Sequence, residues 1–171
     1  MGDDAVKSIE EGLSDAMRAE YEGLHFYAMA AASTSDEKGK AMFLTLSDDE
    51  RRHAEFLKAQ YDSIRKTGKP NSTVSLGPIP SYEGASPIFP DGIRARIQQA
   101  HYEMTALSVG IQLELDAVKH YNRLAEAATD PAVFKFFKDL AEWESEHYRI
   151  LLAQQEDLKE AYWTSNGFSP M

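Results

Sequence analysis

Glu50-Arg51-Arg52-His53 and Glu144-Ser145-Glu146-His147 are two copies of a Glu-x-x-His motif that lie 94 residues apart in the chain. A histidine three residues after a glutamate lies one turn further along the same face of a helix. Each copy can therefore offer a carboxylate oxygen and an imidazole nitrogen to one metal ion. A single Glu-x-x-His is a weak signal, so its meaning depends on the residues around the two copies.

The offset of 94 residues relates the two halves of the chain without a gap. Matched polar residues carry more weight than matched apolar ones, because any two core helices share apolar positions. A repeat of this kind predicts two helical hairpins related by a pseudo-two-fold axis. The matched pairs include Glu20 and Glu114, Tyr27 and Tyr121, Ala31 and Ala125, Asp36 and Asp130, Phe43 and Phe137, Leu46 and Leu140, Glu50 and Glu144, His53 and His147, and Leu57 and Leu151.

Apolar residues recur at helical spacing through four segments, and turn residues separate the two members of each pair. Thr-Ser-Asp at 34–36 divides the first pair. Thr-Asp-Pro at 129–131 divides the second, with Asp130 as the expected N-cap before Pro131. The expected helices span roughly residues 4–33, 37–66, 105–128 and 131–160.

The segment between the two pairs has a different composition. Five of the seven prolines fall in it, which indicates an extended crossover long enough to run the length of a bundle. Asp91 could cap a short helix through about residue 103, before Thr105 caps the third long helix. The prediction is one all-α domain, a ferritin-like four-helix bundle of two repeated helical hairpins joined by a long crossover that contains a short helix. The expected boundaries are 1–171 for the domain, 4–66 for the first helix pair, 67–104 for the crossover and 105–160 for the second helix pair.

The matched glutamates and histidines occupy core positions. Glu50 and His53 continue the apolar spacing of the second expected helix, and Glu20 lies on the apolar stripe of the first. Their repeat partners, Glu114, Glu144 and His147, lie at the corresponding core positions of the third and fourth expected helices. Four carboxylates directed into one interior repel each other, so they must protonate or find cations, and two divalent cations balance their charge. The predicted metal ligands are Glu20, Glu50, His53, Glu114, Glu144 and His147.

Other polar and aromatic residues lie close to these ligands in the sequence. Glu22 and His25 form a third Glu-x-x-His, but they lie off the apolar stripe and are expected on the helix surface. Tyr27 and Tyr121 follow the first glutamate of each half by two turns on the same face. They could donate hydrogen bonds to ligand carboxylates, or be core aromatics with a satisfied hydroxyl. Trp143 is expected to be a packing residue.

The composition disfavours several classes of protein. A net charge of −10 over 171 residues makes nucleic acid and membrane surfaces poor partners. The absence of cysteine excludes disulfides, Cys-type zinc sites and iron–sulfur clusters. An acidic N-terminus that leads directly into a helical pattern predicts no signal peptide, and no apolar run is long enough to span a bilayer. The expected location is therefore the cytoplasm.

At these motifs the sequence resembles the rubrerythrin branch of the ferritin-like superfamily, and the resemblance covers both helix pairs. It implies a non-haem di-iron site that reacts with oxygen or peroxide, as a peroxidase or as a ferrous-iron oxidase. The implied assignments are Glu50 and Glu144 as bridges between two iron ions, Glu20 with His53 on one iron, and Glu114 with His147 on the other.

The sequence departs from rubrerythrins in two respects. It lacks the cysteines of their rubredoxin-like domain, so its electrons would come from a separate partner protein. It has Ala117, matched by Gly23, where rubrerythrins carry an extra glutamate ligand. The symmetric six-ligand set is similar to that of bacterioferritin, which moves the expectation from a peroxidase toward a ferroxidase or a general oxidase.

Three functions follow from these patterns. The site reduces peroxide or oxygen as a redox enzyme, or oxidises ferrous ion for storage or delivery, or holds metal ions that only stabilise the fold. Carboxylate and imidazole ligands also accept manganese and zinc, so the sequence does not fix the metal. Apolar residues in and near the crossover predict a homodimer. They are Ile79, Tyr82, Ile88 and Phe89.

Overall fold

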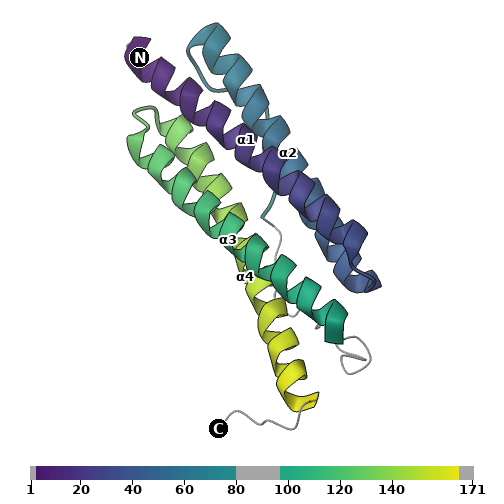
Figure 1. The fold of residues 1–171 in the computed structure, drawn as a ribbon. Coiled ribbons are helices and arrows are strands. Elements are labelled where there is room, and N and C mark those ends of the chain that lie inside the picture. The colour runs from purple at the N-terminus through teal and green to yellow at the C-terminus, as the bar shows by residue number, and fades with distance from the viewer. Residues whose placement is uncertain (1–2, 80–96, 166–171) are drawn as a thin grey trace.

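The computed structural model describes residues 3–79 and 97–165, and these residues form four α-helices and no strand. Helices α1 and α2 pack as one antiparallel hairpin, helices α3 and α4 pack as another, and the four share a common long direction (Figure 1). The predicted all-α bundle of two repeated hairpins is therefore confirmed. The helix bounds are Asp3–Ser33 for α1, Glu37–Thr67 for α2, Ile97–Ala127 for α3 and Pro131–Ser165 for α4.

Helices α2 and α4 begin at the turn residues that the sequence singled out. Asp36 accepts a hydrogen bond from the Gly39 amide at 2.8 Å and caps α2. Asp130 accepts one from the Ala132 amide at 2.7 Å, directly before α4. Such caps satisfy amide groups that have no partner within the first turn of a helix. The repeat therefore includes the aspartate that caps the second helix of each hairpin.

Helix α3 begins earlier than the sequence predicted. It is continuous from Ile97, so over residues 97–103 the expected separate short helix is the first part of α3 itself. Residues 91–96, including the proposed cap Asp91, lie outside the described residues. Thr105 does not cap a helix, because its hydroxyl donates to the carbonyl of His101 at 2.8 Å within α3. A threonine that bonds back to the preceding turn can stay inside a helix, and neither glycine nor proline interrupts this stretch.

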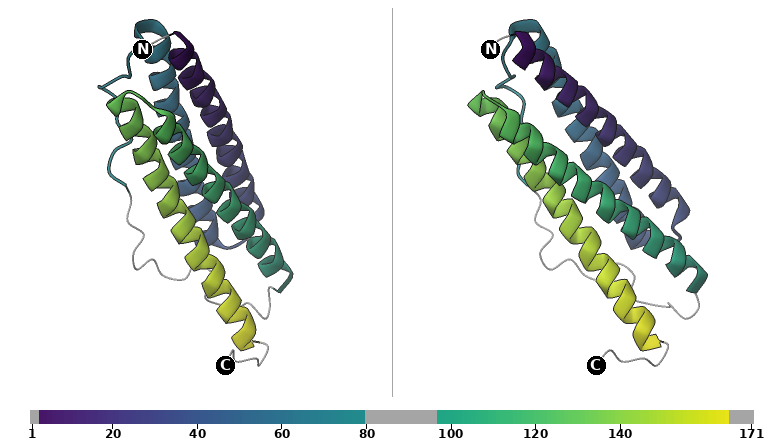
Figure 2. Two further views of the ribbon diagram at one scale, coloured as in Figure 1. Left: turned by 90° about the vertical axis from the view of Figure 1, so that its left-hand side faces the viewer. Right: turned by 60° about the vertical axis from the view of Figure 1, so that its left-hand side comes forward.

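The two hairpins run in opposite directions along the bundle. Helix α3 begins at the end of the bundle opposite to the end of α2 (Figures 1 and 2). Helices α1 and α3 therefore run antiparallel, and so do α2 and α4. Gln60 holds the start of the crossover to α2, because its side chain donates to the Asn71 carbonyl at 3.1 Å and accepts from the Asn71 amide at 2.8 Å.

The interior consists of two apolar clusters with a polar layer between them. One cluster includes Tyr27, Phe43, Leu46 and Leu151. The other includes the repeat partners of these residues, Tyr121, Phe137, Leu140 and Leu57. The two clusters keep water away from both ends of the polar layer. No stretch of the described helices combines the length and apolarity that crossing a bilayer requires.

Candidate metal centre

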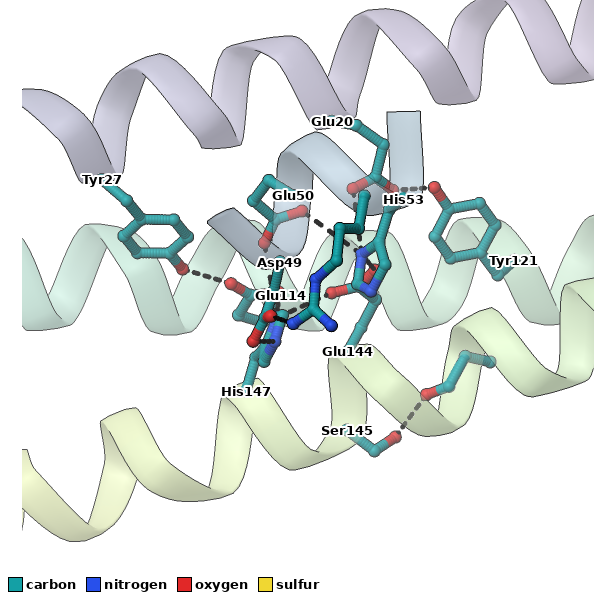
Figure 3. Close-up of polar contacts among 12 residues, drawn as sticks. Glu20, Tyr27, Asp49, Glu50, His53, Glu114, Tyr121, Glu144, Ser145 and His147 are labelled. Carbon is teal, nitrogen blue, oxygen red and sulfur yellow. Dashed lines mark hydrogen bonds and ion pairs between the residues drawn. The ribbon is translucent and has the colours of Figure 1, made fainter. Parts of the chain in front are cut away.

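Six side chains from all four helices meet in the polar layer (Figure 3). Helices α1 and α3 each contribute one glutamate, and helices α2 and α4 each contribute a Glu-x-x-His pair. All six are at most 4 % exposed. The helical spacing that aligned these residues with the apolar stripes therefore brings every predicted ligand into the interior. They are Glu20, Glu50, His53, Glu114, Glu144 and His147.

The ligand atoms form two overlapping groups in which all atoms lie within 4.8 Å of one another. One group contains Glu20 and His53, and the other contains Glu114 and His147. Glu50 and Glu144 belong to both groups. This is the grouping that the resemblance implied, with the two shared carboxylates from α2 and α4 between the two positions. Metal binding at these positions is still a prediction.

Both histidines present Nδ1 to the carboxylates. Nδ1 of His53 lies 2.9 Å from a Glu144 oxygen and 3.3 Å from a Glu20 oxygen. Nδ1 of His147 lies 3.1 Å from Glu144 and 3.3 Å from Glu50. The two rings stack with 5.5 Å between their centroids, so helices α2 and α4 face each other across the site.

Several of these buried atoms have no hydrogen bond within the described part of the chain, although they lie close together. They are Glu20 Oε2, both Glu144 carboxylate oxygens, and Nδ1 of His53 and of His147. Buried polar atoms are rarely left without a partner. Here the ligand atoms of each group lie within 4.8 Å of one another, close enough to bind one metal ion together. The residues present therefore fit two divalent ions.

Burial and mutual repulsion set the protonation of the carboxyl groups. Burial raises the pKa of Glu20, and the charges of Glu144 and Glu50 raise it further. Burial and the charge of Glu50 raise the pKa of Glu114 to about 8. Burial also opposes the ionisation of Glu50, but contacts with Glu20 and with the histidines outweigh it and hold its pKa well below the usual range.

The remaining groups complete a neutral cluster. Burial opposes the ionisation of Glu144, but the charge of His53 lowers its pKa. Burial disfavours the protonation of both imidazoles, yet the surrounding carboxylates raise the pKa of His53 and of His147 well above the usual value. At neutral pH and without metal, these pKa shifts favour two imidazolium ions balanced by two carboxylates, with the other two carboxyls protonated. Two divalent ions would displace these four protons.

Two buried tyrosines bind the terminal glutamates, which are Glu20 and Glu114, the two that belong to only one ligand group each. The Tyr27 hydroxyl of α1 donates to Glu114 of α3, and the Tyr121 hydroxyl of α3 donates to Glu20 of α1 (Figure 3). Each tyrosine follows the glutamate of its own helix by seven residues. Because α1 and α3 run antiparallel, this position lies beside the glutamate of the other helix. Burial and the adjacent carboxylate raise the pKa of each tyrosine, which keeps both as neutral donors.

Two residues beside the histidines were missed in the sequence. Asp49 is 1 % exposed, and its Oδ2 lies 3.3 Å from Nε2 of His147. Trp143, expected only to pack, places its ring 5.2 Å from the ring of His53. The signal for Asp49 was its helical spacing, since it lies three residues after Leu46 on the buried face of α2.

Glu22 and His25 do not join the centre. Both side chains are exposed on α1, as the helical spacing predicted, and neither belongs to a ligand group among the described residues. Glu22 instead lines a cavity of about 320 Å³ on the face formed by α1 and α3. Glu20, Glu50 and Glu114 form its inner wall, so this cavity connects the carboxylates with the surface.

Small residues keep this cavity open. Gly23 and Ala117 occupy matched positions on its wall. A β-carbon at Gly23 would lie 3.4 Å from the side chain of Glu50, in contact with one of the two shared carboxylates. Helix α1 thus approaches Glu50 closely, with no side chain at position 23 between them.

The bundle and its buried cluster define a ferritin-like protein with a candidate two-metal centre. Comparison with protein families makes this assignment specific, because the family model named Rubrerythrin matches residues 11–155. The match covers most of the chain, including both hairpins, and the chain belongs to the rubrerythrin family. No curated protein and no solved structure matched the chain.

Proposed function

We propose that this protein is a di-iron oxidoreductase that reduces peroxide or oxygen with electrons from a separate donor protein. The observation that carries the proposal is the pair of overlapping ligand groups, each with three carboxylates and one imidazole, that share Glu50 and Glu144. Oxygen and nitrogen ligands in this arrangement are the set found in ferritin-like di-iron proteins. Manganese and zinc suit the same ligand types, so iron is part of the proposal.

Two ferrous ions held by these ligands would supply one electron each, which together with two protons is what the reduction of one peroxide molecule to two water molecules requires. The protein's own residues hold the reaction in place. Glu50 and Glu144 fix the two positions next to each other. Tyr27 and Tyr121 orient the terminal glutamates and remain protonated donors. The apolar clusters at both ends exclude bulk water, which strengthens the electrostatic interactions inside.

The position and volume of the cavity between α1 and α3 support the proposal that the substrate is a small molecule. It leads from the surface to Glu20, Glu50 and Glu114. A volume of about 320 Å³ admits dioxygen or hydrogen peroxide without any change in the helices. An oxidant that enters the cavity can therefore reach the carboxyl groups of Glu20, Glu50 and Glu114.

Ferrous-iron oxidation is the second candidate, and one feature of the same cavity favours it. Glu22 and Asp116 are matched acidic residues on the cavity wall, and both are exposed. Negative charge at a mouth raises the local concentration of cations. Storage or delivery of iron would then follow oxidation.

Stopped-flow oxidation separates the candidates. The protein is loaded anaerobically with two equivalents of Fe²⁺ and mixed with peroxide or with oxygen. Faster oxidation by peroxide, with re-reduction by an added electron donor, supports the oxidoreductase. Repeated turnover with excess Fe²⁺ and oxygen, with accumulation of ferric iron, supports the ferroxidase. If the protein binds two ferrous ions and neither reagent oxidises them, the metal site is structural and both redox proposals fail.

A further inference from the structure

The sequence repeat is broken beside each histidine. The six predicted ligands all have repeat partners, but Asp49 corresponds to Trp143, 94 residues later. Each residue directly precedes the glutamate of a Glu-x-x-His pair. Both are buried, at 1 % and 3 % exposure, and both lie against an imidazole of the centre. The surroundings of the two ligand groups therefore differ where the ligands themselves match.

Asp49 holds the ring of His147. Nε2 of His147 lies 3.3 Å from Oδ2 of Asp49, while Nδ1 of the same ring faces the ligand carboxylates (Figure 3). Arg52 donates to Oδ1, the other oxygen of Asp49. When Nδ1 binds a metal, Nε2 carries the proton and donates it in a hydrogen bond to the carboxylate. This contact fixes the orientation of the ring and makes Nδ1 a stronger electron donor.

Trp143 cannot do the same for His53. Its indole N–H is only a donor, and Nε2 of a metal-bound neutral imidazole is also a donor, so no hydrogen bond can form between them. The rings meet edge to face at an interplanar angle of 80°. Within the described residues, neither Nε2 of His53 nor Nε1 of Trp143 has a hydrogen-bond partner. Arg52 lies over the Trp143 ring at 5.5 Å, so one arginine contacts both members of the broken repeat.

We infer that the two metal positions are inequivalent: Asp49 anchors His147 so that the metal held by Glu114 and His147 binds first and more tightly. The metal held by Glu20 and His53 binds second. This inference rests on the proposed two-metal centre. Asp49 is a positioning residue, because it acts on the metal through His147.

The size of the difference follows from comparable metal sites. Removing the partner of a ligating histidine typically lowers metal affinity by roughly 10- to 100-fold. We therefore expect the metal-free protein to take up Co²⁺ in two resolved steps. The two dissociation constants should differ by at least about 10-fold, with the tighter step assigned to His147.

Calorimetric titration of the full chain with Co²⁺ alone tests the assignment. Asp49→Asn keeps the shape of the side chain and removes its charge. It should weaken the tighter step by roughly 10-fold or more and leave the weaker step unchanged. Asp48→Asn is the matched control, because Asp48 is exposed and pairs with Arg51 at 3.1 Å away from the centre. It should leave both steps as in the unaltered protein.

A double-mutant cycle identifies the histidine that Asp49 serves. In a His147→Ala chain, the further change Asp49→Asn should have no effect on the remaining Co²⁺ step. In a His53→Ala chain, Asp49→Asn should still weaken the remaining step. Two equal steps in the unaltered protein, or equal effects of Asp49→Asn in both backgrounds, would overturn the inference while leaving the two-metal centre intact. A chain that binds no Co²⁺ would instead refute the centre itself.

Discussion

Glu50 and Glu144 belong to both ligand groups, so each is expected to serve two metal ions. Replacing either with alanine removes one oxygen donor from both positions. We expect Glu50→Ala or Glu144→Ala to lose at least one metal per chain, as measured by elemental analysis after dialysis. Their thermal stability in metal-containing buffer should also fall, because metal bound only to the folded state stabilises it.

The control for these variants is the third Glu-x-x-His of the chain. By motif alone, Glu22 and His25 look as good as Glu50 and His53. Both residues are exposed, however, so the double change Glu22→Ala and His25→Ala should retain close to two metals. Equal metal loss from this pair and from Glu50→Ala would contradict the assignment of ligands.

Tyr27 and Tyr121 each bury a hydroxyl that donates to a glutamate of the opposite helix. Tyr27→Phe removes the donor and leaves a buried carboxyl with one partner fewer. We expect the free energy of unfolding in urea to fall by about 1–3 kcal/mol. Tyr21→Phe is the matched control, since Tyr21 is exposed on the same helix, and it should change stability by less than about 0.5 kcal/mol. Equal stabilities for the two variants would show that the buried hydroxyl contributes nothing.

At the scale of the helix, Gly110 lets α3 approach its neighbours. A β-carbon there would lie 3.1 Å from Leu151 and 3.2 Å from the Tyr27 ring and hydroxyl. The tyrosine cannot yield easily, because its hydroxyl is bonded to Glu114 and its ring stacks on Phe43. We therefore expect Gly110→Ala to lower stability by about 1–3 kcal/mol, despite the better helix propensity of alanine.

Val109→Ala tests whether that loss is specific to position 110. Val109 is exposed on the same helix, so its replacement should change the free energy of unfolding by less than about 0.5 kcal/mol. Chemical denaturation of both variants is the measurement. An unchanged or raised stability for Gly110→Ala would mean that Tyr27 moves freely and is not held by its hydrogen bond.

At the scale of the whole molecule, the neutral cluster makes stability depend on pH. The folded-state pKa values of Glu20, Glu114, His53 and His147 lie above their ordinary values. For such groups, the stabilising effect is complete below the ordinary pKa and is lost as pH rises through the folded-state pKa. Glu114 should contribute to this loss between its ordinary pKa of 4.5 and its folded-state pKa of about 8, and the two histidines above their ordinary pKa of 6.5, so the metal-free protein should lose stability between about pH 6 and 9. The loss should be about 1 kcal/mol per pH unit for each retained proton.

Metal should reverse this trend. Bound divalent ions replace the same protons, and protons compete less well at higher pH, so the stabilisation by metal should grow from pH 6 to 9. Thermal unfolding with and without excess metal at several pH values is the measurement. A metal-free protein whose melting temperature rises over this range would contradict the assigned protonation states.

We also propose that the protein forms a homodimer to which the crossover contributes. Of the apolar residues that suggested this, Ile79 is described and is 39 % exposed, while Tyr82, Ile88 and Phe89 lie outside the described residues. Sedimentation should show a dimer for the unaltered chain, weakened by Ile79→Asp. Met29→Asp is the control, because Met29 is even more exposed but lies on α1. A monomer at micromolar concentration would refute the proposal, and a large cage would favour iron storage.

The sequence by itself determined the two hairpins and the set of residues that meets inside them. Glu-x-x-His at helical spacing, on apolar stripes and repeated after 94 residues, already placed all six predicted ligands in one interior. This worked because a helix has a fixed period, so the face on which a residue lies follows from its position alone. The start of α3 was missed because Thr105 can either cap a helix or bond within one, and local sequence does not decide between them.

Only the tertiary structure decided which residues meet across helices. The bond of Tyr27 to Glu114, rather than to the nearer Glu20 in sequence, depends on α1 and α3 running antiparallel. The contact of Asp49 with His147 crosses from α2 to α4 and joins residues 98 positions apart. Helical periodicity gives the direction of each side chain but not the neighbour it reaches, because that neighbour is set by how the two hairpins pack. The difference between the surroundings of the two histidines therefore appears only when the hairpins come together.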